Sequence, residues 1–289
     1  MRQEVKFQKK TLELIDSINE ILKEYKEAGM TITTRGLFYQ LVARNIIPNN
    51  LQSYEKLSRD STKARYAGLV DWDIIIDNSN FLSICNFFDN VEDLIKAAKQ
   101  SYRLDRWEGQ DYYIEVWVEK DALRNVVEPV TNNFQINLFI PGGRVSTTMI
   151  YKASERFSIQ QQKGKKCILL YLGDHDPCGL DMILRDIPKR LINLKNDIKI
   201  IPIALTKNQI QKYNLPTDQL TKKKDKNKNW YSSLANTDKC WELDALKPKV
   251  IQEITEKFIL EFLDMEKYNL VVKQEKKDIE KIETGLGKQ

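Results

Sequence analysis

CILLYLGDHDP, residues 167–177, carries the clearest indication of the fold. Its first six residues are apolar without polar alternation, which is typical of a central parallel strand that is covered on both faces. Three more runs of strand length alternate with segments that fit helices: YYIEVWVEK (112–120), INLFIPGG (136–143) and IKIIPIAL (198–205). We therefore expect an α/β fold with a mostly parallel four-stranded sheet flanked by helices.

Carboxylates follow two of the expected strands. Asp174 and Asp176 come directly after the apolar run, and Glu119 ends the first strand. The carboxyl ends of parallel strands meet at one edge of a sheet, so we expect the three side chains to lie together. Carboxylates that lie a few ångströms apart repel one another unless a cation lies among them. Mg²⁺ prefers carboxylate and phosphate oxygens as ligands. The sequence predicts a Mg²⁺ site, with Mn²⁺ as a substitute ion.

A simpler interpretation of this stretch stays open. Asp174 and Asp176 also fit as caps of the following helix, where acidic side chains are favoured. His175 lies between them, and its ring should point away from theirs in an extended turn, so we do not expect it to be a ligand.

The first eighty residues predict three helices followed by a strand and a turn. The first helix is expected over 11–29, where apolar residues recur at three- and four-residue steps before Gly29: Leu12, Ile15, Ile18, Leu22 and Tyr25. Thr34 is the expected N-cap of the second helix, 51–70 the third, and 71–80 the strand and turn. This order matches the outline of a winged helix-turn-helix, which many small helical subdomains share.

Positive charges suggest where an anionic partner binds. The third helix carries Lys56, Arg59, Lys63 and Arg65, which we expect to contact DNA phosphates, although a solvated face explains them nearly as well. Arg144 follows the pair Gly142 and Gly143, which fits either a phosphate contact or a tight turn. The lysine-rich run 221–233 fits a solvated loop or a further phosphate contact.

The composition favours a soluble chain of two domains. Its 289 residues carry a net charge of +5, which permits an anionic partner without requiring one. No run approaches the ~20 apolar residues of a membrane helix, and the first sixteen residues lack the apolar core of a signal peptide. We expect no membrane partner and a cytoplasmic location. At the C-terminal end, 250–270 predicts one packed helix, and the charged residues from 273 a poorly ordered or partner-dependent tail.

Four motifs together resemble a known family. VEKDAL (118–123) and LGDHDP (172–177) are similar to the Glu and Asp-x-Asp-Pro signature of the Toprim fold, specifically in the topoisomerase VI A subunit and meiotic double-strand-break transesterase family. RGLFY (35–39) stands where that family has Arg-x-x-Tyr/Phe-Tyr, with Phe38 where many relatives have tyrosine, and WELDAL (241–246) resembles a later family segment. The resemblance covers roughly residues 10–250.

The resemblance implies a winged-helix (CAP-like) DNA-binding domain over 1–108 and a Toprim domain with a C-terminal helical extension over 109–289. It implies that Tyr39 is the nucleophile, that Arg35 is its motif arginine, and that Glu119, Asp174 and Asp176 bind Mg²⁺. The implied activity is that of a type IIB topoisomerase A subunit, which cleaves double-stranded DNA as a homodimer. The tyrosine of one subunit then meets the metal of the other, and the location is nucleoid-associated. Either a separate B-like subunit supplies the ATPase, or the protein has a simpler cleavage role without one.

Elementary chemistry is compatible with this role for Tyr39. On an ideal helix, Tyr39 lies about 130° from the centre of the apolar stripe 37–42, so its hydroxyl can reach an outside partner. A phenol is a poor nucleophile at neutral pH, and Arg35 one turn earlier would help to stabilise the phenolate. Two other hypotheses remain. In the first, the protein is a Toprim nuclease that hydrolyses DNA with metal-activated water, and Tyr39 has only a structural role. In the second, the protein is a DNA-binding module that catalyses no reaction.

Overall fold

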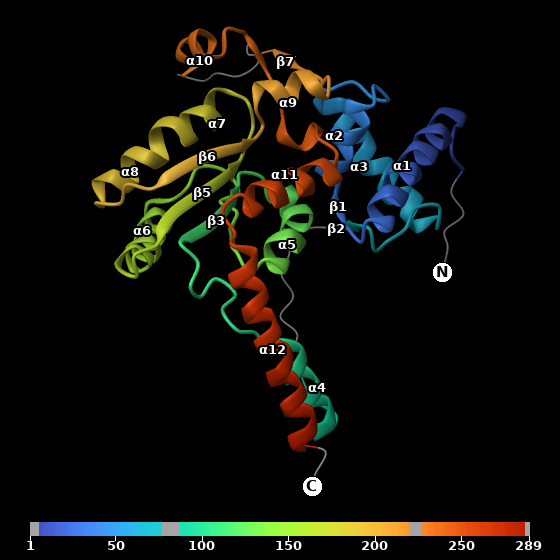
Figure 1. Cartoon of the computed structure of the whole chain (residues 1–289). Helices are drawn as coiled ribbons and strands as arrows, with labels where there is room; N and C mark the ends of the chain where they lie inside the picture. The colour runs from blue at the N-terminus through green and yellow to red at the C-terminus, as the bar shows by residue number, and fades with distance from the viewer. Residues whose placement is uncertain (1–5, 77–86, 220–226, 287–289) are drawn as a thin grey trace.

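A parallel four-stranded sheet forms the centre of the second half of the chain (Figure 1). The computed structural model describes residues 6–76, 87–219 and 227–286. The strand order is β4-β3-β5-β6, and every neighbouring pair is parallel. The strands are β3 (Tyr112–Val118), β4 (Asn137–Phe139), β5 (Lys166–Leu172) and β6 (Lys199–Ala204). All four expected strands are confirmed.

The central strand β5 contributes to a core on each face of the sheet. Ile168, Leu170 and Leu172 pack into one apolar cluster, while Leu169 and Tyr171 pack into another. Side chains alternate between the two faces of a strand, so an uninterrupted apolar run needs cover on both sides. That cover comes from helices (Figure 1): α5 (Arg124–Asn133) and α11 (Pro248–Leu260) on one face, α6 (Thr147–Gln162) and α8 (Ile187–Asn193) on the other.

The N-terminal part contains the three expected helices. They are α1 (Lys9–Glu27), α2 (Thr34–Ala43) and α3 (Leu51–Tyr66). The predicted stripe of α1 is buried except for Leu12, which is 43% exposed. The cap of α2 is Thr33 rather than the expected Thr34, because the Thr33 hydroxyl accepts a hydrogen bond from the Gly36 amide.

The expected strand after α3 pairs in a different way from a hairpin. Strand β2 (Ile75–Ile76) lies parallel to β1 (Ile32–Thr33), the segment that leads into α2. The expected turn continues into 77–80, which lie outside the described residues, as do 221–226 of the lysine-rich run. The winged-helix assignment therefore stays a prediction.

The N-terminal helices share a core with the sheet. Ile18 and Leu41 belong to the same buried cluster as Val116 and Leu170. The buried Gln40 amide of α2 donates to the Asp244 and Leu246 carbonyls at 3.0 and 3.1 Å. These contacts fix α2 against the edge of the sheet where the strands end.

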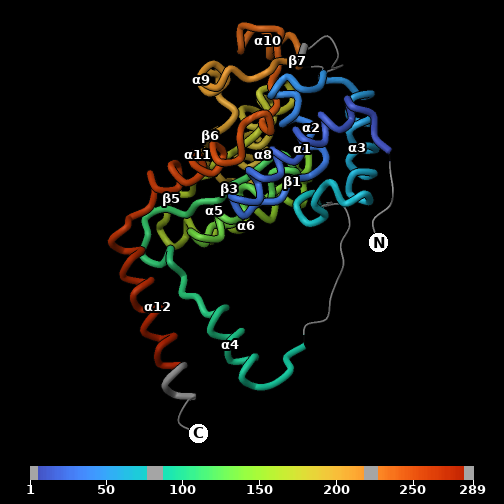
Figure 2. The backbone as a smooth tube through the Cα atoms, turned by 90° about the vertical axis from the view of Figure 1, so that its right-hand side faces the viewer, coloured from blue at the N-terminus to red at the C-terminus, as the bar shows by residue number. Residues whose placement is uncertain are grey.

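The described part of the C-terminal tail, residues 273–286, is helical, whereas a poorly ordered tail was expected. Helix α12 (Met265–Leu286) takes in most of the charged segment and extends away from the sheet, as does α4 (Val91–Ser101) (Figure 2). Arg106, in the segment between α4 and β3, forms a partly buried ion pair with Glu275 of α12 at 2.8 Å, a long-range contact that local sequence does not reveal.

The remaining elements of the described residues are short: η1 (Asp121–Leu123), α7 (Pro177–Asp181), η2 (Met182–Asp186), α9 (Lys207–Lys212), β7 (Asp218–Gln219), α10 (Lys228–Ala235), β8 (Lys239–Cys240) and η4 (Leu243–Ala245). Within the described ranges, no helix is both long enough and apolar enough to cross a membrane.

Candidate functional site

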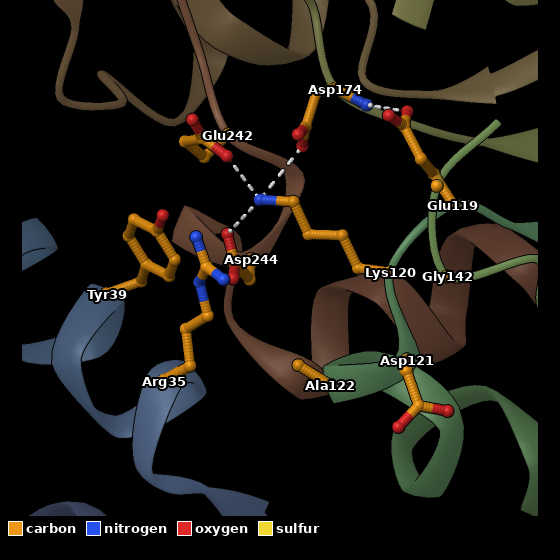
Figure 3. A pocket seen from close by; sticks show the side chains of 11 residues that line it. Arg35, Tyr39, Glu119, Lys120, Asp121, Ala122, Gly142, Asp174, Glu242 and Asp244 are labelled. Atoms are coloured by element: carbon orange, nitrogen blue, oxygen red, sulfur yellow. Dashed lines mark hydrogen bonds and ion pairs between the residues drawn. The ribbon is translucent and has the colours of Figure 1, made fainter. Parts of the chain in front are cut away.

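A pocket of about 570 Å³ opens where β3 and β5 end, facing α2 (Figure 3). Its lining comes from five segments of the chain: Arg35 and Tyr39; Glu119, Lys120, Asp121 and Ala122; Gly142 and Gly143; Asp174; and Glu242 and Asp244. The predicted tyrosine and arginine of α2 thus lie on the same pocket as two of the predicted carboxylates. We call this the carboxylate pocket.

Glu119 is held tightly at the end of β3. Its Oε2 accepts hydrogen bonds from the Asp174 amide at 3.1 Å and the Tyr171 hydroxyl at 3.3 Å. A Cβ on Gly173 would lie only 2.7 Å from this oxygen, so glycine is required for the close approach. Burial raises the pKa of Glu119, against the lowering effect of the Asp174 amide. The expected proximity of Glu119 to the Asp-x-Asp segment is confirmed.

Asp174 is buried in the wall of the pocket. Its Oδ1 accepts a hydrogen bond from the Leu243 amide at 2.7 Å and lies 3.1 Å from the Lys120 ammonium. Burial raises the pKa of this carboxyl well above its usual value, and nearby carboxylates add to the effect while Lys120 opposes it. Lys120 is thus the cation beside Asp174, and its charge opposes the effect of burial.

Asp176 has the helix-capping role that the sequence left open. Its side chain accepts a hydrogen bond from the Gly179 amide at 2.7 Å and caps α7. Asp176 is not among the residues that line the pocket. In the part of the chain that the structure describes, no three His, Cys, Asp or Glu side chains are arranged to hold a metal ion. The expected convergence of all three carboxylates is therefore not seen.

Lys120 lies at the centre of the cluster (Figure 3). Its ammonium pairs with Asp244 at 2.9 Å, with Asp174 at 3.1 Å and with Glu242. It also lies 4.9 Å from the centre of the Tyr39 ring. Burial favours a lower pKa for Lys120, but the surrounding carboxylates outweigh it and raise the pKa well above the usual value.

Glu242 and Asp244 were not predicted as site residues. A backbone bridge between His175 and Trp241 brings their segment to the end of β5, with N–H···O distances of 2.9 and 3.1 Å. Asp244 is 2% exposed, and its Oδ2 is buried without a hydrogen-bond partner. The available signal was the acidic spacing in WELDAL, which repeats the Asp-x-Asp spacing at 174–176.

Tyr39 has the orientation predicted from helical periodicity. Leu37, Phe38 and Leu41 are buried in the core, whereas Tyr39 is half-buried and lines the pocket. Burial raises the pKa of the phenol and Glu242 adds to this, while Lys120 and a hydrogen bond from Arg35 lower it. Two cations thus lie next to the phenol.

The predicted DNA-binding residues fall into two groups. Lys56, Arg59 and Lys63 are exposed on α3, where Arg59 also pairs with Asp60 at 3.6 Å. Arg65 instead donates to the Trp72 and Ile75 carbonyls at 2.9 and 2.7 Å, so it joins α3 to β2. Arg144 is 45% exposed but pairs with Asp181 at 2.9 Å.

The pocket supplies carboxylates, the ligand type that Mg²⁺ prefers, although no three of them among the described residues are arranged to hold an ion. Glu119, Asp174, Glu242 and Asp244 all present carboxylates to one pocket, and the buried Oδ2 of Asp244 lacks a partner. The Lys120 ammonium now lies where these charges converge, so an ion would have to displace it or bind beside it. No protein-family model, curated protein or solved structure matches this chain.

Proposed function

We propose that this protein is a Mg²⁺-dependent enzyme that cleaves double-stranded DNA through Tyr39, in the manner of a type IIB topoisomerase A subunit. One observation carries the proposal: Tyr39 and Arg35 of α2 line the same pocket as Glu119 and Asp174 at the strand ends. We further propose that the sheet is a Toprim domain and that the N-terminal helices form a winged-helix DNA-binding domain.

In the proposed reaction, the Tyr39 oxygen attacks a backbone phosphorus and the bond from phosphorus to the deoxyribose oxygen breaks. The phenol loses its proton, the leaving oxygen gains one, and the broken bond is conserved as a tyrosyl phosphodiester that can be reversed. Lys120 and Arg35 favour the phenolate because their charges lie beside it. Bound Mg²⁺, held by Glu119 and Asp174, would stabilise negative charge on the phosphoryl oxygens.

The subunit arrangement belongs to the same proposal. The resemblance implies that the tyrosine of one subunit meets the metal of its partner, yet here Tyr39 lines the pocket of its own chain. Each subunit therefore presents both halves of a site, and a homodimer would cut the two strands with two sites. A separate B-like ATPase partner and a nucleoid-associated location also stay predictions.

A second candidate is hydrolysis by metal-activated water, with Tyr39 in a structural role. One observation favours it: burial raises the pKa of Tyr39, which disfavours the phenolate that attack requires. Both candidates need Glu119 and Asp174, so Tyr39 distinguishes them.

The test is to incubate the protein with Mg²⁺ or Mn²⁺ and end-labelled duplex DNA, denature it, and measure label retained on protein. Transesterification predicts retained label that Tyr39→Phe abolishes together with cleavage. Hydrolysis predicts cleavage without retained label and an active Tyr39→Phe variant. Glu119→Gln should be inactive in either case, and wild-type protein that leaves every duplex intact with both ions would refute both candidates.

A further inference from the structure

A second pocket of about 550 Å³ adjoins the carboxylate pocket. The two share Arg35 and Tyr39, so they meet at the proposed nucleophile. The rest of the lining comes from the middle of α2, the following loop and the start of α3: Phe38, Asn49, Asn50, Leu51 and Tyr54. We call this the aromatic pocket.

Three aromatic rings, those of Phe38, Tyr39 and Tyr54, line the aromatic pocket. Phe38 is only 5% exposed, and the rings of Tyr39 and Tyr54 both pack edge-to-face against it. The centroid distances are 5.4 and 5.5 Å, with interplanar angles of 65° and 86°. The buried phenylalanine thereby fixes both tyrosine rings at the wall of an open cavity. Leu51, which is 70% exposed, adds apolar surface at the rim.

The polar groups of this pocket also suit a nucleotide. Asn49 and Asn50 line it, and amide side chains offer both donors and acceptors to a base edge. Asn50 uses its oxygen to accept a hydrogen bond from the Ser53 amide, which fixes the side chain at the start of α3. Arg35 adds positive charge where the two pockets meet.

We propose that the aromatic pocket binds one unstacked nucleobase of the nucleic acid whose phosphate lies in the carboxylate pocket. The inference rests on the proposed function for its substrate, and it adds a preference for substrates with an unpaired base. A base in a perfect duplex must first leave the stack, which costs a few kcal/mol, whereas an unpaired base stacks on aromatic side chains at no such cost. Single-stranded or mismatched DNA should therefore bind more tightly than perfect duplex.

The test uses a single-stranded oligonucleotide that contains 2-aminopurine, whose fluorescence falls when the base stacks. Binding is measured with Ca²⁺ in place of Mg²⁺, so that the carboxylate pocket keeps a divalent ion for the phosphate, and the oligonucleotide is checked for cleavage afterwards. We expect quenching with wild-type protein, and about a 5- to 150-fold higher Kd for Tyr54→Leu, from the ~1–3 kcal/mol of one base–aromatic stack. Tyr54→Phe keeps the ring and should behave as wild type. Tyr151→Leu, at an exposed tyrosine of α6, is the matched control.

The outcomes separate this inference from the proposed function. Binding without quenching, or a folded Tyr54→Leu variant that binds and quenches like wild type, would overturn the base-binding pocket alone. Quenching that depends on Tyr54, in a protein that never cleaves DNA, would support the pocket and refute the nuclease or transesterase activity. Absence of any DNA binding would overturn the pocket whatever else the protein does.

Discussion

Replacement of Lys120 by methionine removes the cation that lies among three carboxylates. The ammonium is within 3.1 Å of both Asp174 and Asp244 and also pairs with Glu242, and its side chain is only 18% exposed. Loss of one partner of a buried ion pair typically costs about 3–5 kcal/mol, because the remaining charge is left without compensation. Such a loss is a large part of the ~5–15 kcal/mol by which a typical protein is stable.

Urea unfolding followed by circular dichroism at pH 7 measures this loss. Lys26→Met is the matched control, because Lys26 pairs with Asp71 at a similar distance of 2.9 Å but is exposed to solvent. Exposed pairs contribute little, so the control should leave the urea midpoint unchanged. A Lys120→Met variant as stable as wild type would refute the account of Lys120 as the cation on which the cluster depends.

The pH dependence gives a second check on the same variant. Burial is the main cause of the raised pKa values of Glu119, Asp174 and Asp244 in the folded protein. At pH values between the ordinary carboxyl pKa and these raised pKa values, the folded state therefore binds more protons than the unfolded state. Stability therefore increases as the pH falls through this interval. Without Lys120 these pKa values rise further, so the variant should recover toward wild type between pH 7 and pH 5. A stability difference that is independent of pH would contradict this reasoning.

Three further predictions concern other residues. Asp176→Asn should keep stability and cleavage, because asparagine caps a helix as well as aspartate does. Asp176→Ala should lower the free energy of unfolding by about 1 kcal/mol, measured by urea unfolding. A stable but inactive Asp176→Asn variant would contradict a purely capping role and point to Asp176 as a metal ligand. Mg²⁺ should raise the thermal midpoint of wild type but not of Asp174→Asn, and equal shifts would place the ion elsewhere. Lys63→Met should weaken DNA binding and reduce its salt dependence without loss of stability, while Arg65→Met should lower the unfolding temperature; the reverse pattern would contradict the roles assigned to these side chains.

The strands of the four-stranded sheet and the three N-terminal helices follow from local patterns. The apolar run of β5 predicted a strand covered on both faces, and the stripe 37–42 predicted which side of α2 is buried. The proximity of Glu119 and Asp174 was also predictable, because adjacent parallel strands end at one edge. In each case the periodicity of a strand or helix is a property of neighbouring residues, and these can be read in order along the chain.

The composition of the carboxylate pocket depends on contacts between distant residues. The Asp-x-Asp spacing fits either a pair of metal ligands or a helix N-cap. Asp176 is an N-cap, because its side chain accepts a hydrogen bond from the Gly179 amide. Glu242 and Asp244 reach the pocket only because the backbone at Trp241 pairs with His175. Lys120 looks like any charged residue until three carboxylates from two other segments surround it. Burial and pairing of charge arise when separate segments pack together, so no local pattern contains them.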